Sequence, residues 1–248
     1  DPLFEAGSRP AAPLSADDFA LWLWGYWGRL RGYLFRNPLR FGQASAEEWR
    51  DAEARAAADD GFHTFWSSQI FGFDALTALA IVGREVPGIE LGTAVVPTYP
   101  RHPMMLAQQA LTVQAATGGR LALGIGLSHQ IVVESMWGLS YAKPVRHLRE
   151  YLSVLMPLLE GQPVKFEGEE YRVQGGLAAP GSSRPSVVVA ALGPQMLRVT
   201  GAMADGTSTW CVGPKVLREL TIPTLRQAAA DAGRPEPRVV CALPVCVT

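Results

Sequence analysis

The chain has 248 residues, 48% of them hydrophobic, and its 22 Lys and Arg residues nearly balance 23 Asp and Glu residues. This length suits one large α/β domain, and the hydrophobic content is sufficient for a sizeable core. The net charge of −1 and the lack of a basic stripe argue against a nucleic-acid partner.

Residues 1–37 form an atypical N-terminal segment to which we assign no function. The run Phe19–Trp27 holds three of the seven tryptophans, but it is shorter than the roughly 20 apolar residues of a membrane-spanning helix. An amphipathic helix packed on the domain is favoured over an interfacial helix. We therefore expect no membrane association and place the main domain at residues 38–248.

The rest of the chain alternates between extended and helical patterns. The extended runs are almost continuously apolar, which is typical of a parallel sheet covered on both faces. The predicted strands are residues 62–66, 89–96, 121–127, 187–192, 207–212 and 239–248. The predicted helices are residues 46–60, 74–82, 103–116, 144–159, 194–204 and 214–232.

One connection is longer than the others. Residues 164–173 contain two short extended pieces around a glycine, which predicts a small β-hairpin insertion. The strand and helix repeats imply right-handed crossovers. Two architectures fit this pattern, an eight-fold (β/α)8 barrel of the TIM type and an open doubly wound sheet.

Gly124 and Gly126 lie at the end of a predicted strand and suggest a nucleotide-binding fingerprint. The third glycine of that pattern is missing, because position 129 is histidine. The favoured interpretation is that small residues allow a ligand or a neighbouring strand to approach the backbone closely.

Several polar residues are candidates for a functional site. His129 follows a strand end, where parallel α/β folds bind ligands. Arg101 either contacts an anion or stabilises local structure, and the sequence does not decide between these. His147 lies on a predicted helix between Arg146 and Arg149 and is expected to face solvent.

The sequence contains no serine nucleophile elbow, H-E-x-x-H motif or CxxC pair, and no metal site is predicted. An enzyme without such groups usually takes its reactive chemistry from an organic cofactor. The three cysteines lack metal or redox spacing, so we expect buried thiols in a reducing compartment. With no signal-peptide pattern, a cytoplasmic location is expected.

Four segments, in this order along the chain, resemble the luciferase-like monooxygenase superfamily, and within it the branch that uses the deazaflavin coenzyme F420. They are residues 92–95 with Arg101-His102-Pro103, residues 120–126, residues 189–194 and residues 204–206. The resemblance covers roughly residues 40–248. It implies a TIM-type (β/α)8 barrel with insertions that binds flavin or deazaflavin at the carboxyl ends of its strands.

The resemblance also implies site residues. It implies a strand bulge with a non-prolyl cis peptide at Ala94–Val95, which would press the backbone against the cofactor ring. It implies a phosphate-side loop at residues 191–194, at the start of a helix. The implied cofactor-binding residues are Trp66, Gln69, Ala94, Val95, Gly126, Leu127, Ser128, Ala191, Leu192, Gly193 and Pro194. His129 is the candidate catalytic residue, which would orient the substrate or give it a proton.

The chain departs from its relatives at several points. Gln69-Ile70 stands where relatives often have an Asp-His pair, and His129 stands where sugar-phosphate-oxidising relatives are often acidic. Oxidation of a sugar phosphate is therefore not expected. The first strand has only a weak candidate at residues 39–42, and no eighth strand follows Thr248, so the barrel is expected to be incomplete.

Three functions remain open at this point. The first is hydride transfer between coenzyme F420 and a small organic substrate. The second is an FMN-dependent monooxygenase, and the third is an inactive barrel fragment or a partner-binding module. Because relatives are often dimers, a homodimer is also expected.

Overall fold

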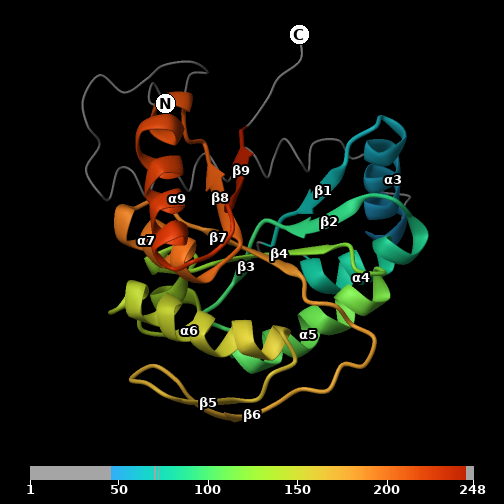
Figure 1. Cartoon of the computed structure of the whole chain (residues 1–248). Coiled ribbons are helices and arrows are strands. Elements are labelled where there is room, and N and C mark those ends of the chain that lie inside the picture. The colour runs from blue at the N-terminus through green and yellow to red at the C-terminus, as the bar shows by residue number, and fades with distance from the viewer. Residues whose placement is uncertain (1–45, 70, 72, 244–248) are drawn as a thin grey trace. The chain divides into compact units, whose positions relative to one another are not determined.

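The computed structural model describes residues 46–69, 71 and 73–243 (Figure 1). Contacts divide the chain into residues 1–49 and 50–248, and the description concerns the second part together with the helix α3 (Ala46–Asp59). The predictions for residues 1–37, for a first strand at residues 39–42 and for the domain boundary after residue 37 lie outside the described residues.

A parallel sheet forms the centre of this part of the chain, as predicted. Its strands lie in the order β1 (Thr64–Ser67), β2 (Glu90–Thr93), β4 (Leu121–Gly126), β7 (Ser186–Ala190), β8 (Gly206–Trp210) and β9 (Arg238–Ala242). The short strand β3 (Val96–Pro97) pairs with β4. The strands occur in the sheet in the same order as in the chain, and a helix connects most neighbouring strands.

Helices cover the outer face of this sheet (Figure 1). They are α4 (Ala75–Glu85), α5 (Pro103–Ala116), α6 (Pro144–Leu159) and α7 (Pro194–Met203), followed by the continuous segment α8 (Pro214–Val216), η3 (Leu217–Thr221) and α9 (Ile222–Asp231). The predicted bounds of α5 and α6 are confirmed. Both begin with proline at the first helical position, where the missing N–H is not needed.

The predicted helix at residues 214–232 is interrupted. The turn Leu217–Thr221 is π-helical, and Pro223 follows it in the first turn of α9. Proline lacks an N–H and crowds the carbonyl four residues earlier, so a wider turn before it relieves the clash. A second π-helical turn, η2 (Val132–Met136), was not predicted.

Side chains close both ends of α4. The Asp74 carboxylate accepts hydrogen bonds from the Thr77 N–H and hydroxyl, each at 2.8 Å, which confirms the predicted cap. At the other end, the Arg120 guanidinium donates to the carbonyls of Val86 and Ile89 at 3.0 and 2.8 Å. The Asp74 bond to the Thr77 N–H and a further Arg120 bond to the Gly83 carbonyl in the last turn satisfy backbone groups that a helix end leaves unpaired.

The main core lies between the sheet and these helices. Leu123 and Ile125 of β4 are fully buried in the same cluster as Leu148, Leu152 and Leu155 of α6. The three leucines lie on one face of α6 because they are spaced four and three residues apart. Each such side chain contributes about 2 kcal/mol by leaving water.

An ion pair shows that the sheet is curled like part of a barrel. The Arg238 guanidinium of β9 donates to both carboxylate oxygens of Glu90 of β2, at 2.9 and 2.7 Å. Four strand spacings separate β2 from β9, about 19 Å in a flat sheet, which is too far for two side chains to meet. The predicted TIM-type architecture is therefore confirmed as a half-barrel over the described residues.

The predicted hairpin is also confirmed. Strands β5 (Val164–Glu167) and β6 (Arg172–Gly175) pair antiparallel and lie on the far side of α5 and α6 from the sheet (Figure 1). The hairpin therefore does not belong to the half-barrel, and it contacts the domain through α6.

Asp205, at the amino end of β8, binds two separate segments of the chain, residues 184–187 and the loop after α9. Its carboxylate accepts hydrogen bonds from the Val187 N–H at 2.8 Å and from Arg184 and Arg234 at 2.9 and 3.0 Å. We expect Asp205→Ala to lower the free energy of unfolding by about 2 kcal/mol, because the bonds to charged donors are lost together. Denaturant unfolding measures this change.

The matched control is Asp231→Ala, since Asp231 is exposed and bonds only to Gln227 in the same helix among the contacts described. Its effect should remain below about 0.5 kcal/mol. Equal effects of the two substitutions would show that Asp205 does not join these segments.

The prediction of buried thiols is wrong for Cys211 and Cys241, which are both exposed. Cys211 follows β8 where the strand leaves the sheet, and Cys241 lies on the edge strand β9, so neither is covered by a further strand among the described residues. Cys246 lies outside the described residues. None of the helices in the described part of the chain is long and apolar enough to cross a membrane.

Candidate functional site

The strand after α4 is broken by a bulge. Gly92 pairs with Ala122, whereas Val96 pairs with Ile125, so β2 and β3 contain one residue more than the matching part of β4. The extra residue falls at the Ala94–Val95 peptide bond, which is cis. Both features were implied by the resemblance, and the structure confirms them.

The side chain of Thr93 closes the gap that the bulge leaves in the hydrogen-bond ladder. Its hydroxyl accepts from the Gly124 N–H at 2.9 Å and donates to the Gly124 carbonyl at 2.7 Å. Thr93 is fully buried, so this pairing satisfies two backbone groups that would otherwise be costly to bury.

The two glycines of β4 are needed for close packing. A Cβ atom at Gly124 would lie 1.8 Å from the Thr93 carbonyl oxygen, and one at Gly126 would lie 2.6 Å from the Val95 Cγ2 atom. The interpretation of close backbone approach is therefore confirmed, and these glycines do not need a nucleotide to explain them.

Three strand ends meet at Gly126. A Cβ atom added to Gly126 would contact Val95 from the bulge and would lie 3.2 Å from the Ala190 Cβ atom of β7. Thus the ends of β2–β3, β4 and β7 converge, as the resemblance implies for a cofactor site. Directly after β4, Ser128 adopts a positive φ of 69°, a conformation that non-glycine residues rarely adopt outside functional or turn positions.

The other predicted cofactor-binding residues differ in exposure and in their hydrogen bonds. The Ala191 side chain is buried, whereas Ala94, Leu192, Gly193 and Pro194 are exposed beside the strand ends. Gln69 accepts a hydrogen bond from the Ala75 N–H at 2.7 Å, so its side-chain oxygen already supports the start of α4. Leu127 is buried and leads into the segment that carries His129.

Trp66 lies deeper in the half-barrel than the other predicted contacts. Its indole covers Gly92 of the neighbouring strand, where a Cβ atom would lie 2.3 Å from the ring. The Arg238 guanidinium lies 5.5 Å from the ring centroid, and the indole N–H donates to Thr64. Trp66 therefore fills the inside of the curled sheet, and its role as a cofactor contact stays a prediction.

His129 is exposed at the end of β4. Its carbonyl accepts hydrogen bonds from the Val132 and Val133 N–H groups at 2.9 and 3.0 Å, which fixes its backbone at the start of the following turn. The side chain is exposed directly after this strand end, and its catalytic role stays a prediction.

Arg101 stabilises local structure. Its guanidinium pairs with Asp74, the residue that caps α4, and Gln109 donates to the same carboxylate at 3.2 Å. Burial alone would raise the pKa of Asp74, but the Thr77 hydrogen bonds and the Arg101 charge lower it overall. The loop after β3 is thereby tied to the start of α4.

His147 is buried, although the sequence pattern predicted that it faces solvent. It is only 4% exposed, because it lies one turn before the buried Tyr151 on the same face of α6. Its ring stacks on Tyr99 with centroids 3.9 Å apart and planes at 7°. Burial lowers the pKa of His147 to about 4, against an opposing effect of the Glu170 and Glu150 carboxylates, so the imidazole is neutral near pH 7.

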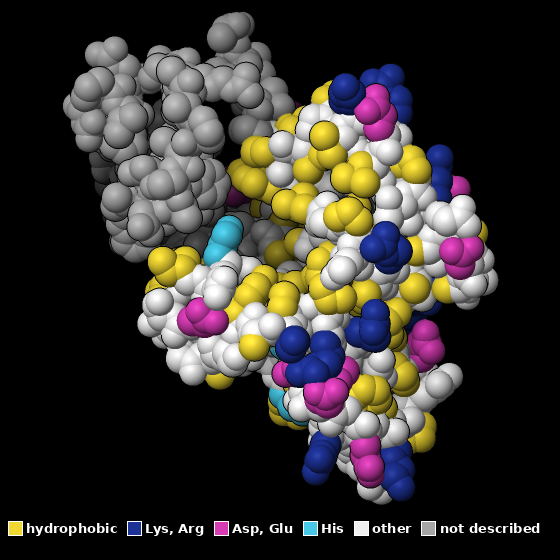
Figure 2. All heavy atoms as spheres, turned by 90° about the vertical axis from the view of Figure 1, so that its left-hand side faces the viewer, with side chains coloured by type: hydrophobic (Ala, Val, Ile, Leu, Met, Phe, Trp, Pro, Cys, Tyr) yellow, Lys and Arg dark blue, Asp and Glu magenta, His cyan; other side chains and the backbone are white. Residues whose placement is uncertain are grey.

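Large hydrophobic side chains remain exposed at the end of β8 and in the segments that follow β1, β4 and β7. They are Phe71, Phe73, Ile131, Met136, Leu192 and Trp210. Figure 2 shows that hydrophobic side chains also gather over the middle and upper part of one face of the described residues. Exposed apolar side chains near a set of strand ends are typical of a ligand-binding edge.

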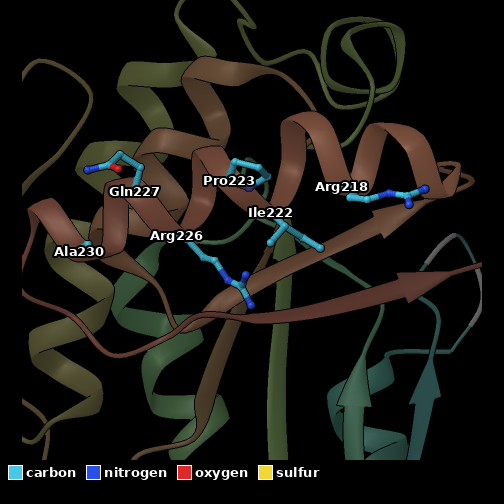
Figure 3. A pocket seen from close by; sticks show the side chains of 6 residues that line it. All are labelled: Arg218, Ile222, Pro223, Arg226, Gln227 and Ala230. Atoms are coloured by element: carbon cyan, nitrogen blue, oxygen red, sulfur yellow. The ribbon is translucent and has the colours of Figure 1, made fainter.

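Two hollows lie away from the strand ends. One, of about 540 Å³, lies along one side of the η3–α9 segment and is lined by Arg218, Ile222, Pro223, Arg226, Gln227 and Ala230 (Figure 3). The other, of about 270 Å³, lies between α5 and residues 177–182. Neither is lined by a predicted cofactor contact. Among the described residues, no cluster of three or more His, Cys, Asp or Glu side chains is suited to a metal ion.

The curled parallel sheet, the bulge after β2 and the glycine-rich end of β4 define a TIM-barrel-like α/β protein of the luciferase type. The model of the luciferase-like monooxygenase family matches residues 34–248. The chain belongs to that family, as its sequence motifs indicated.

Individual relatives agree with this assignment. The chain is 30% identical over 186 residues to 5,10-methylenetetrahydromethanopterin reductase of Archaeoglobus fulgidus, covering 73% of this chain and 54% of that protein. It is 31% identical over 217 residues to F420-dependent glucose-6-phosphate dehydrogenase of Nakamurella multipartita, covering 79% of this chain and 64% of that protein. The chain thus spans less than two thirds of these relatives' length.

Solved structures have the same fold. Coenzyme F420-dependent tetrahydromethanopterin reductase from Methanopyrus kandleri matches with a TM-score of 0.69 and 26% identity, covering 77% of this chain and 61% of that one. The oxygenating constituent of 3,6-diketocamphane monooxygenase from Pseudomonas putida, in complex with FMN, matches with a TM-score of 0.66 and 19% identity, covering 80% and 62%. The second likeness concerns the fold alone.

Proposed function

We propose that this protein is an F420-dependent oxidoreductase that transfers a hydride between coenzyme F420 and a small organic substrate. The observation that carries the proposal is the convergence of Val95, Gly126 and Ala190 at the carboxyl ends of three parallel strands. Such strand ends are where parallel barrels bind their ligands. Relatives whose names include coenzyme F420 support the choice of cofactor.

The residues at this edge fit a planar ring with a phosphate-bearing side chain. The junction is built from small or apolar residues, and exposed apolar side chains lie at the strand ends, such as Trp210 at the end of β8 and Leu192 just after β7. Helix α7 begins at Pro194, its N-cap residue Gly193 provides no side-chain cap, and the space around Gly193 is open. Its first N–H groups are therefore available to an anion such as a phosphate.

The proposed roles of the cofactor and of the protein follow from this geometry. When bound, the deazaflavin supplies the hydride chemistry. The strand ends hold and orient the ring, and the apolar side chains around it exclude water from the reacting centre. His129, exposed beside the end of β4, orients the substrate or donates a proton to it.

The direct test is cofactor binding and oxygen use. We expect the chain to bind F420, measured by quenching of its fluorescence, and to consume no oxygen with the reduced cofactor. Binding of FMN with oxygen consumption would instead favour a monooxygenase, the function in the family's description. Failure to bind either cofactor, in a protein whose circular dichroism shows it to be folded, would contradict both.

A substitution tests the role of His129. In His129→Gln we expect the rate of hydride transfer to fall about 100-fold, because a positioned proton donor contributes at least that much, while the F420 dissociation constant stays within about twofold. His63→Gln is the matched control, since His63 is also exposed but precedes β1 at the opposite end of the sheet. Unchanged turnover in His129→Gln would remove this residue from the reaction.

A further inference from the structure

A chain of buried contacts leads from the end of β4 to the β5–β6 hairpin. The Thr98 N–H donates to the Gly126 carbonyl at 2.9 Å, which continues the pairing of β3 with β4. The Thr98 hydroxyl is hydrogen-bonded to His147 Nε2 at 2.9 Å. Because Thr98 and His147 are both buried, these bonds face no competition from water.

The hairpin reaches the other side of the imidazole. His147 Nδ1 lies 3.4 Å from the Tyr171 hydroxyl. Tyr171 is held by α6, because the Glu150 carboxylate accepts hydrogen bonds from the Glu169, Glu170 and Tyr171 N–H groups at 3.1, 2.8 and 3.0 Å. Both nitrogens of the ring therefore have a hydroxyl partner, and each hydroxyl can donate or accept.

Aromatic rings fix the plane of the imidazole. Tyr99, which follows Thr98 in the same loop, stacks on both His147 and Tyr141, with the two tyrosine centroids 5.3 Å apart. Tyr151 and Tyr171 lie with their centroids 5.7 Å from that of His147. The ring can therefore neither turn nor shift without moving the loop after β3.

We propose that His147 is a positioning residue of the strand-end site: through Thr98 it fixes the loop after β3 and the end of β4 at Gly126. The inference rests on the proposed function, since Gly126 lies where three strand ends meet. Nothing in the geometry requires His147 to touch cofactor or substrate, because its contacts lie on the outer side of β3.

Two variants distinguish a positioning role of His147 from a role in stability alone. A structural role would be served best by packing, so His147→Phe, which keeps a flat ring on Tyr99, should be at least as stable as His147→Gln. A positioning role depends on the hydrogen bond to Thr98. Glutamine can place an amide near the Nε2 position and restore that bond, whereas phenylalanine cannot.

The experiment measures the F420 dissociation constant by fluorescence at a temperature well below the unfolding midpoint of each variant. We expect His147→Phe and Thr98→Val to raise the dissociation constant about five- to tenfold, the effect of one lost hydrogen bond, and His147→Gln to stay within about threefold of the parent. Tyr151→Phe is the matched control, because the Tyr151 hydroxyl is buried in the same cluster without a hydrogen-bond partner among the described residues. It should bind F420 like the parent.

Two results would overturn the inference. One is parent-like F420 binding by both His147→Phe and Thr98→Val, and the other is weaker binding by His147→Gln than by His147→Phe. If His147→Phe does not fold, Thr98→Val decides alone, since valine keeps the shape of threonine and its backbone N–H. If the parent chain itself binds no F420, the proposed function fails and the inference fails with it, which distinguishes that case from the first two.

Discussion

Gly124→Ala should lower the free energy of unfolding by about 3 kcal/mol or more. The added Cβ atom would lie 1.8 Å from the Thr93 carbonyl oxygen, which is a backbone atom and cannot rotate away. Thr93 is held in place by the two hydrogen bonds between its hydroxyl and Gly124 itself. Relief therefore requires β2 and β4 to separate, and overpacking of a core is most costly where backbone must move.

Denaturant unfolding of the parent and the variant measures this effect, with F420 binding as a second readout. Gly176→Ala is the matched control. Gly176 is exposed, and a Cβ atom there meets only ordinary contacts with Pro163 at 3.5 Å, so its effect should stay within about 0.5 kcal/mol. A Gly124→Ala protein as stable as this control would show that β2 and β4 do not pack as described.

Acid should destabilise the fold through His147. The pKa of this imidazole is about 4 in the folded chain because of burial, compared with about 6.5 when exposed. Between these values the unfolded chain binds the proton and the folded chain does not, so the stabilising effect is complete above pH 6.5 and declines as the pH falls toward 4. The full loss amounts to about 3 kcal/mol.

Several other charged or titratable groups face the imidazole and limit which variants isolate its effect. They are Tyr99 from the loop after β3, Glu150 and Tyr151 from α6, and Glu170 and Tyr171 from the hairpin. The hydroxyls of Tyr99 and Tyr171 stay neutral between pH 4 and pH 7, because burial raises the pKa values of both.

The measurement is the free energy of unfolding from pH 7 to pH 4 for the parent and for His147→Phe. The carboxylates are common to both proteins, so the difference between the two curves isolates His147. We expect the parent to lose about 3 kcal/mol more than the variant over this range. If the two curves of unfolding free energy against pH are parallel, the His147 imidazole is accessible to solvent in the folded chain and is not buried.

Much of the fold could be predicted because it depends on local patterns. Proline at the first position of α5 and of α6, and Asp74 before α4, define helix starts through backbone chemistry within a few residues. The apolar strand runs required a parallel sheet. The bulge at Ala94–Val95 followed from the family resemblance, because nothing in the local sequence requires it.

Local sequence patterns and motifs were sufficient to predict the order of strands and helices, the hairpin insertion and the family. Which polar residues are buried depends instead on contacts between segments that are distant in the sequence. His147 stands between two arginines in sequence, yet the loop after β3 and the hairpin close over it, because the periodicity of a helix shows which residues share a face and not what covers that face. The same holds for Trp66 and Arg238, which meet only because the sheet curls.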